Sequence, residues 1–495
     1  MSIIPTKTGL IHFCGNNYQS VVIHQYLGME ISFHGAARTV TGSKFLLTLD
    51  SGRNVLLDCG MFQGRRKVAG ALNAHFGFEP AGIDYVILTH AHIDHSGLLP
   101  KLVKEGFKGK IYCTRATADV ATLLLYDCAH IQEYDILFQH KRRHKKDKQK
   151  LPQPLYRRQD VDETVALFEM VDYDFPLKID EEITLTFRDA GHILGSATVF
   201  LDVRDHKLTT KLLYTGDLGR YHNSILNSPK PVPQPEIVIC ESTYGNSLHD
   251  STDSAMSQLK NIVLETCVEK GGKLVIPAFS VGRCQEVLYA LNNLFNNNEI
   301  PLIPVYVDSP LSTEATKVIR SHPECFNQNV QELMVEDSDP FTFRGLKFIA
   351  SVEQSKALND NDEPCIIISA SGMADAGRVR HHIANTIGNS RNTVLIIGYC
   401  EASTLGGILM SGVEEVKIFG KIRKVRANVT ILHSFSAHAD YEEICRFLSP
   451  IDPALVTHFF IVHGEPIVQD EFRKRLIEKG FNNVIIPELH EHCFI

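Results

Sequence analysis

Three histidines and one aspartate lie within six residues of a single segment, His90-Ala-His92-Ile-Asp94-His95. Imidazole and carboxylate groups are common protein ligands of zinc. Alternate positions of this segment can turn two imidazoles toward one ion while the Asp-His pair faces a second ion, as a two-metal hydrolytic site requires. The alternative is a polar turn whose histidines are satisfied by hydrogen bonds. Because three histidines and an aspartate occur together after an apolar run, the pattern favours metal binding.

Four ligands from one segment are too few to complete the coordination of two metal ions, so further ligands are expected elsewhere in the chain. Four residues share the same position directly after an apolar, strand-like run: Asp58, His192, Asp217 and His463. Taken singly, each is more typical of a turn or a cap. Their shared position predicts that they complete the metal site.

The elements that position these residues follow from the apolar pattern. Three strands with an antiparallel start are expected over residues 31–60, where runs of Leu, Val and Phe are separated by Ser51-Gly52. A buried strand at 85–89 leads into the metal-binding segment, and leucine spacing predicts a helix over 97–105. Further strands are expected at 183–188, 198–203, 211–215 and 236–240.

Strands and helices alternate after about residue 242. Strands are expected at 273–277, 304–307, 365–369 and 393–398, with helices from residue 283, near residue 313 and from residue 377. This βαβ pattern predicts a parallel sheet covered by helices. We therefore predict one α/β domain formed by residues 31–241 and 426–495, an inserted α/β domain at 242–425, and an N-terminal extension over 1–30. The strand expected at 429–432 is assigned to the C-terminal part of the first domain.

Together these motifs resemble the β-CASP branch of the metallo-β-lactamase fold, including RNA nucleases related to the endonuclease subunit of the cleavage and polyadenylation specificity factor and their prokaryotic relatives. The H-x-H-x-D-H signature is specific to the superfamily. Three later motifs specify the branch: Cys240-Glu241-Ser-Thr-Tyr-Gly245, Ser434-Phe-Ser-Ala-His438-Ala-Asp440 and His463. The resemblance implies an α/β protein, an αββα sandwich with an inserted β-CASP domain.

The resemblance also implies two zinc ions per chain and assigns their ligands. His90, His92 and His192 would hold one ion, Asp94, His95 and His463 would hold the other, and Asp217 would bridge them. Asp58 would orient the site from outside the ligand set. The expected catalytic residues are Asp94, Glu241 and His438.

The expected reaction is hydrolysis of RNA phosphodiester bonds in RNA processing or decay, leaving a 5′-phosphate and a 3′-hydroxyl. His438 would protonate the leaving ribose oxygen, with Glu241 as its orienting partner. His463 favours RNA over DNA, since DNA-processing members of the branch usually carry an aliphatic residue at that position. The alternatives are a small-molecule metallo-hydrolase of the same fold, a DNA nuclease of the branch and a noncatalytic RNA-binding scaffold.

Candidate RNA contacts lie in glycine-rich turns of the insert and in the His438 motif. Backbone amides at a helix N-terminus can bind phosphate, although any strand-to-helix junction also requires such turns. The candidates are Arg283, Ser371, Gly372, Ser434 and Ser436. The run 140–150 holds seven Lys or Arg against one Asp and leaves the rest of the chain at a net charge of -14. It is either an RNA-backbone contact or a solvated surface segment.

Composition excludes several other classes of protein. A chain of 495 residues with 44% hydrophobic and 22% charged residues is globular, and a net charge of -8 argues against nonspecific coating of nucleic acid. Twelve cysteines without a C-x-x-C pair indicate reduced thiols and a cytoplasmic location. The sequence shows no pattern of a signal peptide. It also shows no apolar run of the about 20 residues that a membrane-spanning helix needs. The resemblance also allows a homodimer.

Overall fold

The computed structural model describes residues 29–64, 66–142, 153–205, 208–249, 252–336, 339–398, 400–432 and 436–495. Three features of the sequence analysis lie outside these residues: the N-terminal extension through residue 28, the basic run from residue 143 onward, and Ser434. In the part that is described, no helix is both long and apolar enough to cross a bilayer. The cysteines of this part are all free thiols.

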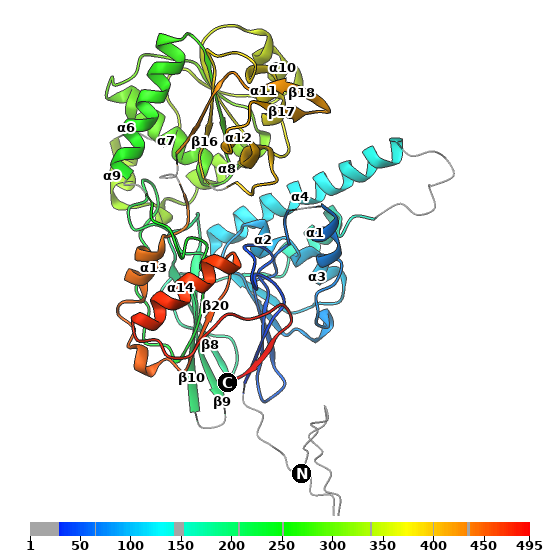
Figure 1. Ribbon diagram of the computed structural model, residues 1–495. Coiled ribbons are helices and arrows are strands. Elements are labelled where there is room, and N and C mark those ends of the chain that lie inside the picture. Colours follow the sequence, from blue (N-terminus) through cyan, green and yellow to red (C-terminus); the bar gives the residue numbers. More distant parts are fainter. Residues whose placement is uncertain are drawn as a thin grey trace, which may run out of the picture.

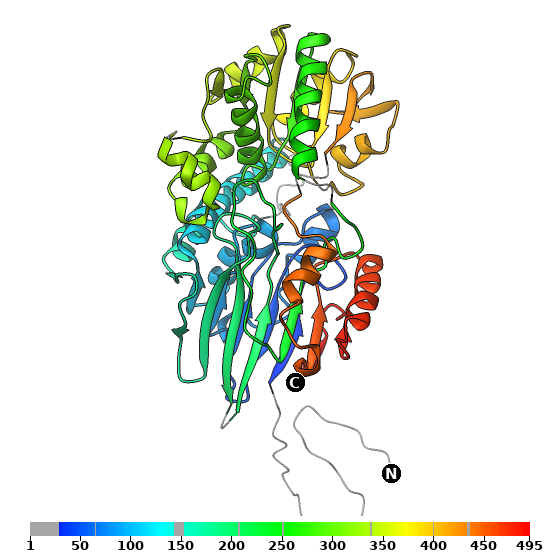
Figure 2. The same cartoon turned by 90° about the vertical axis from the view of Figure 1, so that its left-hand side faces the viewer.

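Two seven-stranded sheets face each other, with the inserted domain stacked on one end (Figures 1 and 2). The first sheet has the order β22 (His492–Phe494), β1 (Glu30–Phe33), β2 (Phe45–Thr48), β3 (Asn54–Leu57), β4 (Tyr85–Ile87), β5 (Lys110–Cys113) and β6 (Phe168–Met170). The second has the order β21 (Val484–Ile485), β20 (His458–Ile461), β11 (Ile237–Cys240), β10 (Leu208–Tyr214), β9 (Ala197–Asp205), β8 (Ile183–Asp189) and β7 (Leu177–Lys178).

Alternating apolar residues join the two sheets. In β8 every second residue is buried, as expected for a strand with one face on a core. Aromatic rings meet across the interface, with centroids 5.0 Å apart for Phe33 and Phe460 and 5.3 Å apart for Phe45 and Tyr214. Helices cover the outer faces: α1 (Arg66–Leu72), α2 (Ile93–Ser96), α3 (Leu99–Lys104), α4 (Arg115–Arg142) and α5 (Arg158–Val165) on one side, α13 (Tyr441–Leu448) and α14 (Pro466–Glu478) on the other. The predicted αββα sandwich is confirmed.

The inserted domain is built on a parallel sheet, as its alternating pattern predicts. Its order is β14 (Leu346–Phe348), β13 (Val305–Val307), β15 (Cys365–Ser369), β12 (Lys273–Pro277), β16 (Thr393–Ile396) and β19 (Asn428–Ile431). Its helices are α6 (Thr252–Val263), continued by a π-helical turn over Leu264–Glu269, α7 (Arg283–Asn296), α8 (Pro310–Arg320), α9 (Gln328–Glu336), α10 (Val352–Asp360), α11 (Val379–Thr386) and α12 (Leu405–Met410). Strands β12 and β15 are buried throughout, because helices cover both faces of the sheet. A hairpin, β17 (Glu415–Ile418) and β18 (Lys421–Lys424), extends the domain.

Strand β19 corrects one sequence assignment. The sequence predicts this strand in the C-terminal part of the sandwich domain, but it pairs in parallel with β16, with Val429 opposite Val394. A short apolar strand fits the edge of either sheet, so its pattern could not decide between them. The parallel sheet of the inserted domain therefore extends through Ile431 in the described chain. The other domain limits stay predictions.

A close backbone contact fixes the metal-binding segment, and glycine makes it possible. A Cβ atom at Gly60 would lie 1.6 Å from the carbonyl oxygen of Asp94, whereas a Cβ at Gly70 in α1 would meet nothing within 4 Å. We expect Gly60→Ala to lower the free energy of unfolding by about 3 kcal/mol, because backbone must move to relieve the overlap. Gly70→Ala should raise it by about 0.5–1 kcal/mol. Chemical denaturation measures both, and equal stability of the two variants would contradict the prediction.

Candidate metal centre

The predicted ligands follow strands of both sheets. His90 follows β4, His192 follows β8, and Asp217 and His463 follow β10 and β20. Strands β10, β11 and β20 are parallel neighbours, so their carboxyl ends meet at one edge. The backbone turns sharply at Asp58 and His463, which have positive φ angles of 57° and 51°. Such angles are uncommon for residues other than glycine and are frequent at functional sites.

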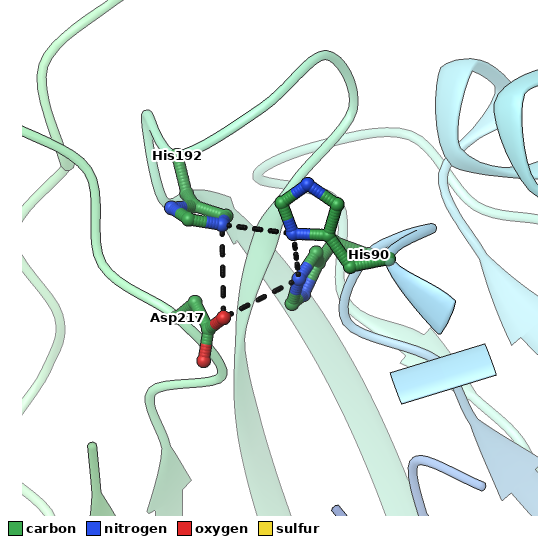
Figure 3. A group of neighbouring side chains, drawn as sticks. His90, His192 and Asp217 are labelled. Atoms are coloured by element: carbon green, nitrogen blue, oxygen red, sulfur yellow. Dashed lines mark hydrogen bonds and ion pairs between the residues drawn. The ribbon is translucent and has the colours of Figure 1, made fainter. Parts of the chain in front are cut away.

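The first group of ligands is compact. The His92 Nδ1 atom lies 3.1 Å from His90 Nε2 and 3.2 Å from His192 Nε2. Asp217 Oδ2 lies 3.5 Å from His90 Nε2 and 3.6 Å from His192 Nε2. Figure 3 shows the labelled side chains of His90, His192 and Asp217 turned toward one another. Four side chains from three distant segments therefore surround one point.

A second group lies on the other side of Asp217. His95 Nε2 is 3.3 Å from Asp217 Oδ1, and His463 Nε2 is 3.6 Å from Asp94 Oδ2. His463 Nδ1 is also 3.6 Å from Asp217 Oδ1. Asp217 thus presents one carboxylate oxygen to each group. The structure brings together the seven residues that the resemblance assigns as metal ligands. Asp58, which the strand-end pattern alone placed with them, lies outside both groups.

These spacings fit metal ions. Ligand atoms 2.0–2.1 Å from a tetrahedral zinc ion are separated by about 3.3–3.4 Å, close to the distances within both groups. Asp217 Oδ1 and His463 Nε2 are buried, and neither has a hydrogen-bond partner among the described residues. A buried polar atom without a partner is costly, and a bound cation removes that cost. The donor set suits a divalent metal.

The protonation states agree with this arrangement. Burial lowers the pKa of His92 to about 4 and holds the pKa values of His90 and His192 well below the ordinary value. These neutral rings have lone pairs for a cation. Burial opposes protonation of His95 as well, but the carboxylates of Asp217 and Asp58 outweigh it and raise the pKa of His95. A metal ion at His95 Nε2 would therefore displace a proton.

Asp58 orients the site without joining either group. Its Oδ2 atom accepts hydrogen bonds from His95 Nδ1 at 2.7 Å, from Tyr214 Oη at 2.6 Å and from Thr89 Oγ1 at 2.8 Å. Its Oδ1 atom accepts from the Thr89 backbone amide at 2.8 Å. Since His95 donates through Nδ1, its Nε2 atom faces Asp217.

Glu241 and His438 form a pair beside the two groups. His438 Nδ1 lies 3.2 Å from both carboxylate oxygens of Glu241, while its Nε2 atom is 4.0 Å from Asp217 Oδ2. Glu241 Oε1 also accepts the amide of Leu218 at 2.7 Å. An isolated β-bridge between Gly219 and His438 holds the backbone of His438 in place. His438 therefore faces the centre with one ring nitrogen and Glu241 with the other.

The predicted RNA contacts are only partly brought together. Arg283 and Ser436 line the same cavity between the sandwich and the inserted domain. Ser371 Oγ instead accepts backbone amides of Asp375 and Ala376, so it stabilises its own turn. A Cβ at Gly372 would lie 2.5 Å from the ring of Phe279, which covers that turn.

Three further residues escaped the sequence analysis. Thr89 and Tyr214 bind Asp58, and Thr243 lies between Glu241 and His463. Each stands inside or next to a motif already singled out. A hydroxyl-bearing residue adjacent to a predicted site residue is the sequence signal that could have identified them.

Three family profiles match the chain. The metallo-beta-lactamase superfamily profile matches residues 39–265 and the Beta-Casp domain profile residues 284–409. The profile of the Zn-dependent metallo-hydrolase RNA specificity domain matches residues 422–487. A protein named ribonuclease TTHA0252 from Thermus thermophilus is 35% identical over 88% of this chain and 93% of its own. The chain belongs to the β-CASP family of the metallo-β-lactamase superfamily. The fold and residues of this β-CASP protein indicate a divalent metal site.

Other relatives of this β-CASP protein have different names. A transcription termination factor, FttA, from Methanocaldococcus jannaschii is 32% identical over 90% of this chain and 69% of its own. Cleavage and polyadenylation specificity factor 73 from Drosophila melanogaster is 28% identical over 88% of this chain and 60% of its own. A crystal structure of a protein of unknown function from Enterococcus faecalis covers 94% of this chain and 100% of its own, with a TM-score of 0.50 at 13% identity, and shows likeness of fold alone.

Proposed function

We propose that this β-CASP protein is a zinc-dependent ribonuclease that hydrolyses RNA phosphodiester bonds and leaves a 5′-phosphate and a 3′-hydroxyl. The observation that carries the proposal is the convergence of seven side chains that could hold metal ions, with the Glu241–His438 pair beside them. RNA as the substrate is supported by the match to an RNA specificity domain and by a relative named as a ribonuclease.

Each of the two groups of ligands would hold one zinc ion. The first comprises His90, His92 and His192, the second comprises Asp94, His95 and His463, and Asp217 belongs to both. Bound zinc ions supply an activated water and neutralise charge on the phosphate. Asp58 keeps His95 in the ligand tautomer.

His438 supplies the proton that the leaving ribose oxygen needs. Glu241 holds Nδ1, so the Nε2–H bond points toward the centre, where Asp217 lies. A positioned imidazolium of this kind contributes about 10²–10⁴-fold to a reaction with a poor leaving group. Arg283 and Ser436, which line the neighbouring cavity, contact the substrate in this proposal.

A long RNA labelled separately at each end tests the function. We expect the purified protein to cut it, chelation to abolish cutting, and added zinc to restore it, because the ligands alone supply no activated water. A DNA of the same sequence is the control substrate. Cutting that persists after zinc removal would contradict the proposal, and preferential cutting of the DNA would favour the DNA-nuclease alternative. The zinc content of active protein should be two ions per chain. The homodimer and the cytoplasmic location stay predictions.

A further inference from the structure

We propose that Thr243 is a positioning residue that orients the metal ligand His463 and the proton donor His438 together. The inference rests on the proposed ribonuclease function. Thr243 lies three residues after the end of β11, in the turn that also carries Glu241. Its Oγ1 atom is 2.6 Å from Glu241 Oε2 and 2.9 Å from His463 Nδ1. One hydroxyl group thus connects the two parts of the site.

The chemistry of the three groups fixes the direction of each hydrogen bond. An ionised carboxylate only accepts, and a threonine hydroxyl has a single hydrogen. The His463 carbonyl oxygen is a second possible acceptor at 3.3 Å, but Glu241 Oε2 is much closer at 2.6 Å. The Thr243 hydroxyl therefore donates to Glu241, and His463 Nδ1 donates to the hydroxyl at 2.9 Å. The remaining nitrogen, His463 Nε2, then carries a lone pair. It is the buried atom that lies 3.6 Å from Asp94 Oδ2, as a metal ligand requires.

The same hydroxyl also restrains the partner of His438. Glu241 is fully buried and accepts from the Thr243 amide at 3.2 Å as well as from its hydroxyl. These bonds hold the carboxylate where both of its oxygens lie 3.2 Å from His438 Nδ1. Without the hydroxyl, Oε2 loses its shortest bond and keeps only the longer bond from the Thr243 amide, so the carboxylate is held less firmly. Misalignment of His438 would follow.

A threonine hydroxyl also lies between a carboxylate and a histidine ring on the opposite side of the centre. Thr89 Oγ1 donates to Asp58 Oδ2 at 2.8 Å and lies 3.1 Å from His90 Nδ1. By the same reasoning His90 Nδ1 donates to Thr89, and His90 Nε2 is free to face Asp217 at 3.5 Å. A threonine between a ligand imidazole and a buried carboxylate thus occurs on both sides. In the Thr243 case the carboxylate also holds His438.

The variants Thr243→Val and Thr243→Ser separate the hydroxyl from the shape of the side chain. Ser242→Ala is the matched control, because Ser242 Oγ belongs to the same turn but donates to the Val462 carbonyl at 2.8 Å. With zinc in excess, we expect Thr243→Val to lower kcat on RNA by about 10-fold or more with little change in KM. Hydrolysis of a thymidine p-nitrophenyl phosphodiester, whose leaving group needs no proton, should stay within about twofold of wild type. Thr243→Ser and Ser242→Ala should behave like wild type on both substrates.

Zinc retention provides a readout that does not depend on activity. In a chelator competition, Thr243→Val should bind one of its two zinc ions about 10-fold more weakly, since the orientation of His463 is lost. Wild-type zinc retention together with wild-type RNA cleavage would overturn the inference, as would an equal loss on both substrates. Thr243→Ala serves if the valine variant does not fold. If the wild type cleaves no RNA, the proposed function fails, while zinc retention still decides the role of Thr243.

Discussion

The His92→Ala variant is expected to lose RNA hydrolysis by about 10³-fold or more while keeping its fold. The His92 ring is the shared neighbour of His90 and His192, at 3.1 and 3.2 Å, so its removal opens the first group of ligands. The ring is only half-buried, and the carbonyl of residue 92 still accepts the amides of His95 and Ser96. The backbone that starts α2 is therefore preserved.

Zinc analysis and RNA digestion measure this variant together. Its zinc content should fall from two ions per chain toward one, because the second group does not include His92. His75→Ala, which removes an exposed imidazole outside the described site, is the matched control and should retain zinc and activity. Activity within tenfold of the control would show that the first group is not needed for hydrolysis.

The metal ligands could be predicted from the sequence because each depends on local pattern. An apolar run identifies a buried strand, and a polar residue directly after it lies at the sheet edge. Parallel neighbours such as β11 and β20 then bring Glu241 and His463 to one edge, whatever their separation along the chain. The fold class follows from the same signals, which explains why strands β12 and β15 match their predicted ranges.

The remaining contacts depend on geometry between distant segments. Thr243 and His463 are separated by 220 positions, and Tyr214 reaches Asp58 across 156 positions. No local pattern distinguishes a hydroxyl that orients a ligand from one that caps a turn. Ser371 is a residue that the sequence pattern suggested for phosphate binding, but its hydroxyl oxygen already accepts a hydrogen bond from a backbone amide of its own loop. Strand β19 was misplaced because its apolar pattern fits either sheet.

The second large effect is expected for His438→Ala, and it should depend on the leaving group. Burial disfavours the imidazolium, but the carboxylates of Glu241 and Asp217 outweigh it and raise the pKa of His438 to about 8. The direction of this shift favours the protonated ring, which can donate from Nε2. Its removal should slow RNA hydrolysis by about 10²–10³-fold, because the departing ribose oxygen must then leave without a positioned acid.

The p-nitrophenyl phosphodiester separates loss of the acid from damage to the metal site. Its leaving group departs without a proton, so His438→Ala should change that rate by less than about threefold. His438 also forms a group with Asp217 and Glu241 that could hold a metal ion, so zinc content is measured directly. It should stay at two ions per chain, since His438 is not among the three histidines of the first group or the ligands of the second. His75→Ala, which removes an exposed imidazole outside both the ligand groups and the cavity lined by Arg283 and Ser436, is the control. An equal loss on both substrates would place His438 in metal binding or in folding, because only a proton donor makes the effect depend on the basicity of the leaving oxygen.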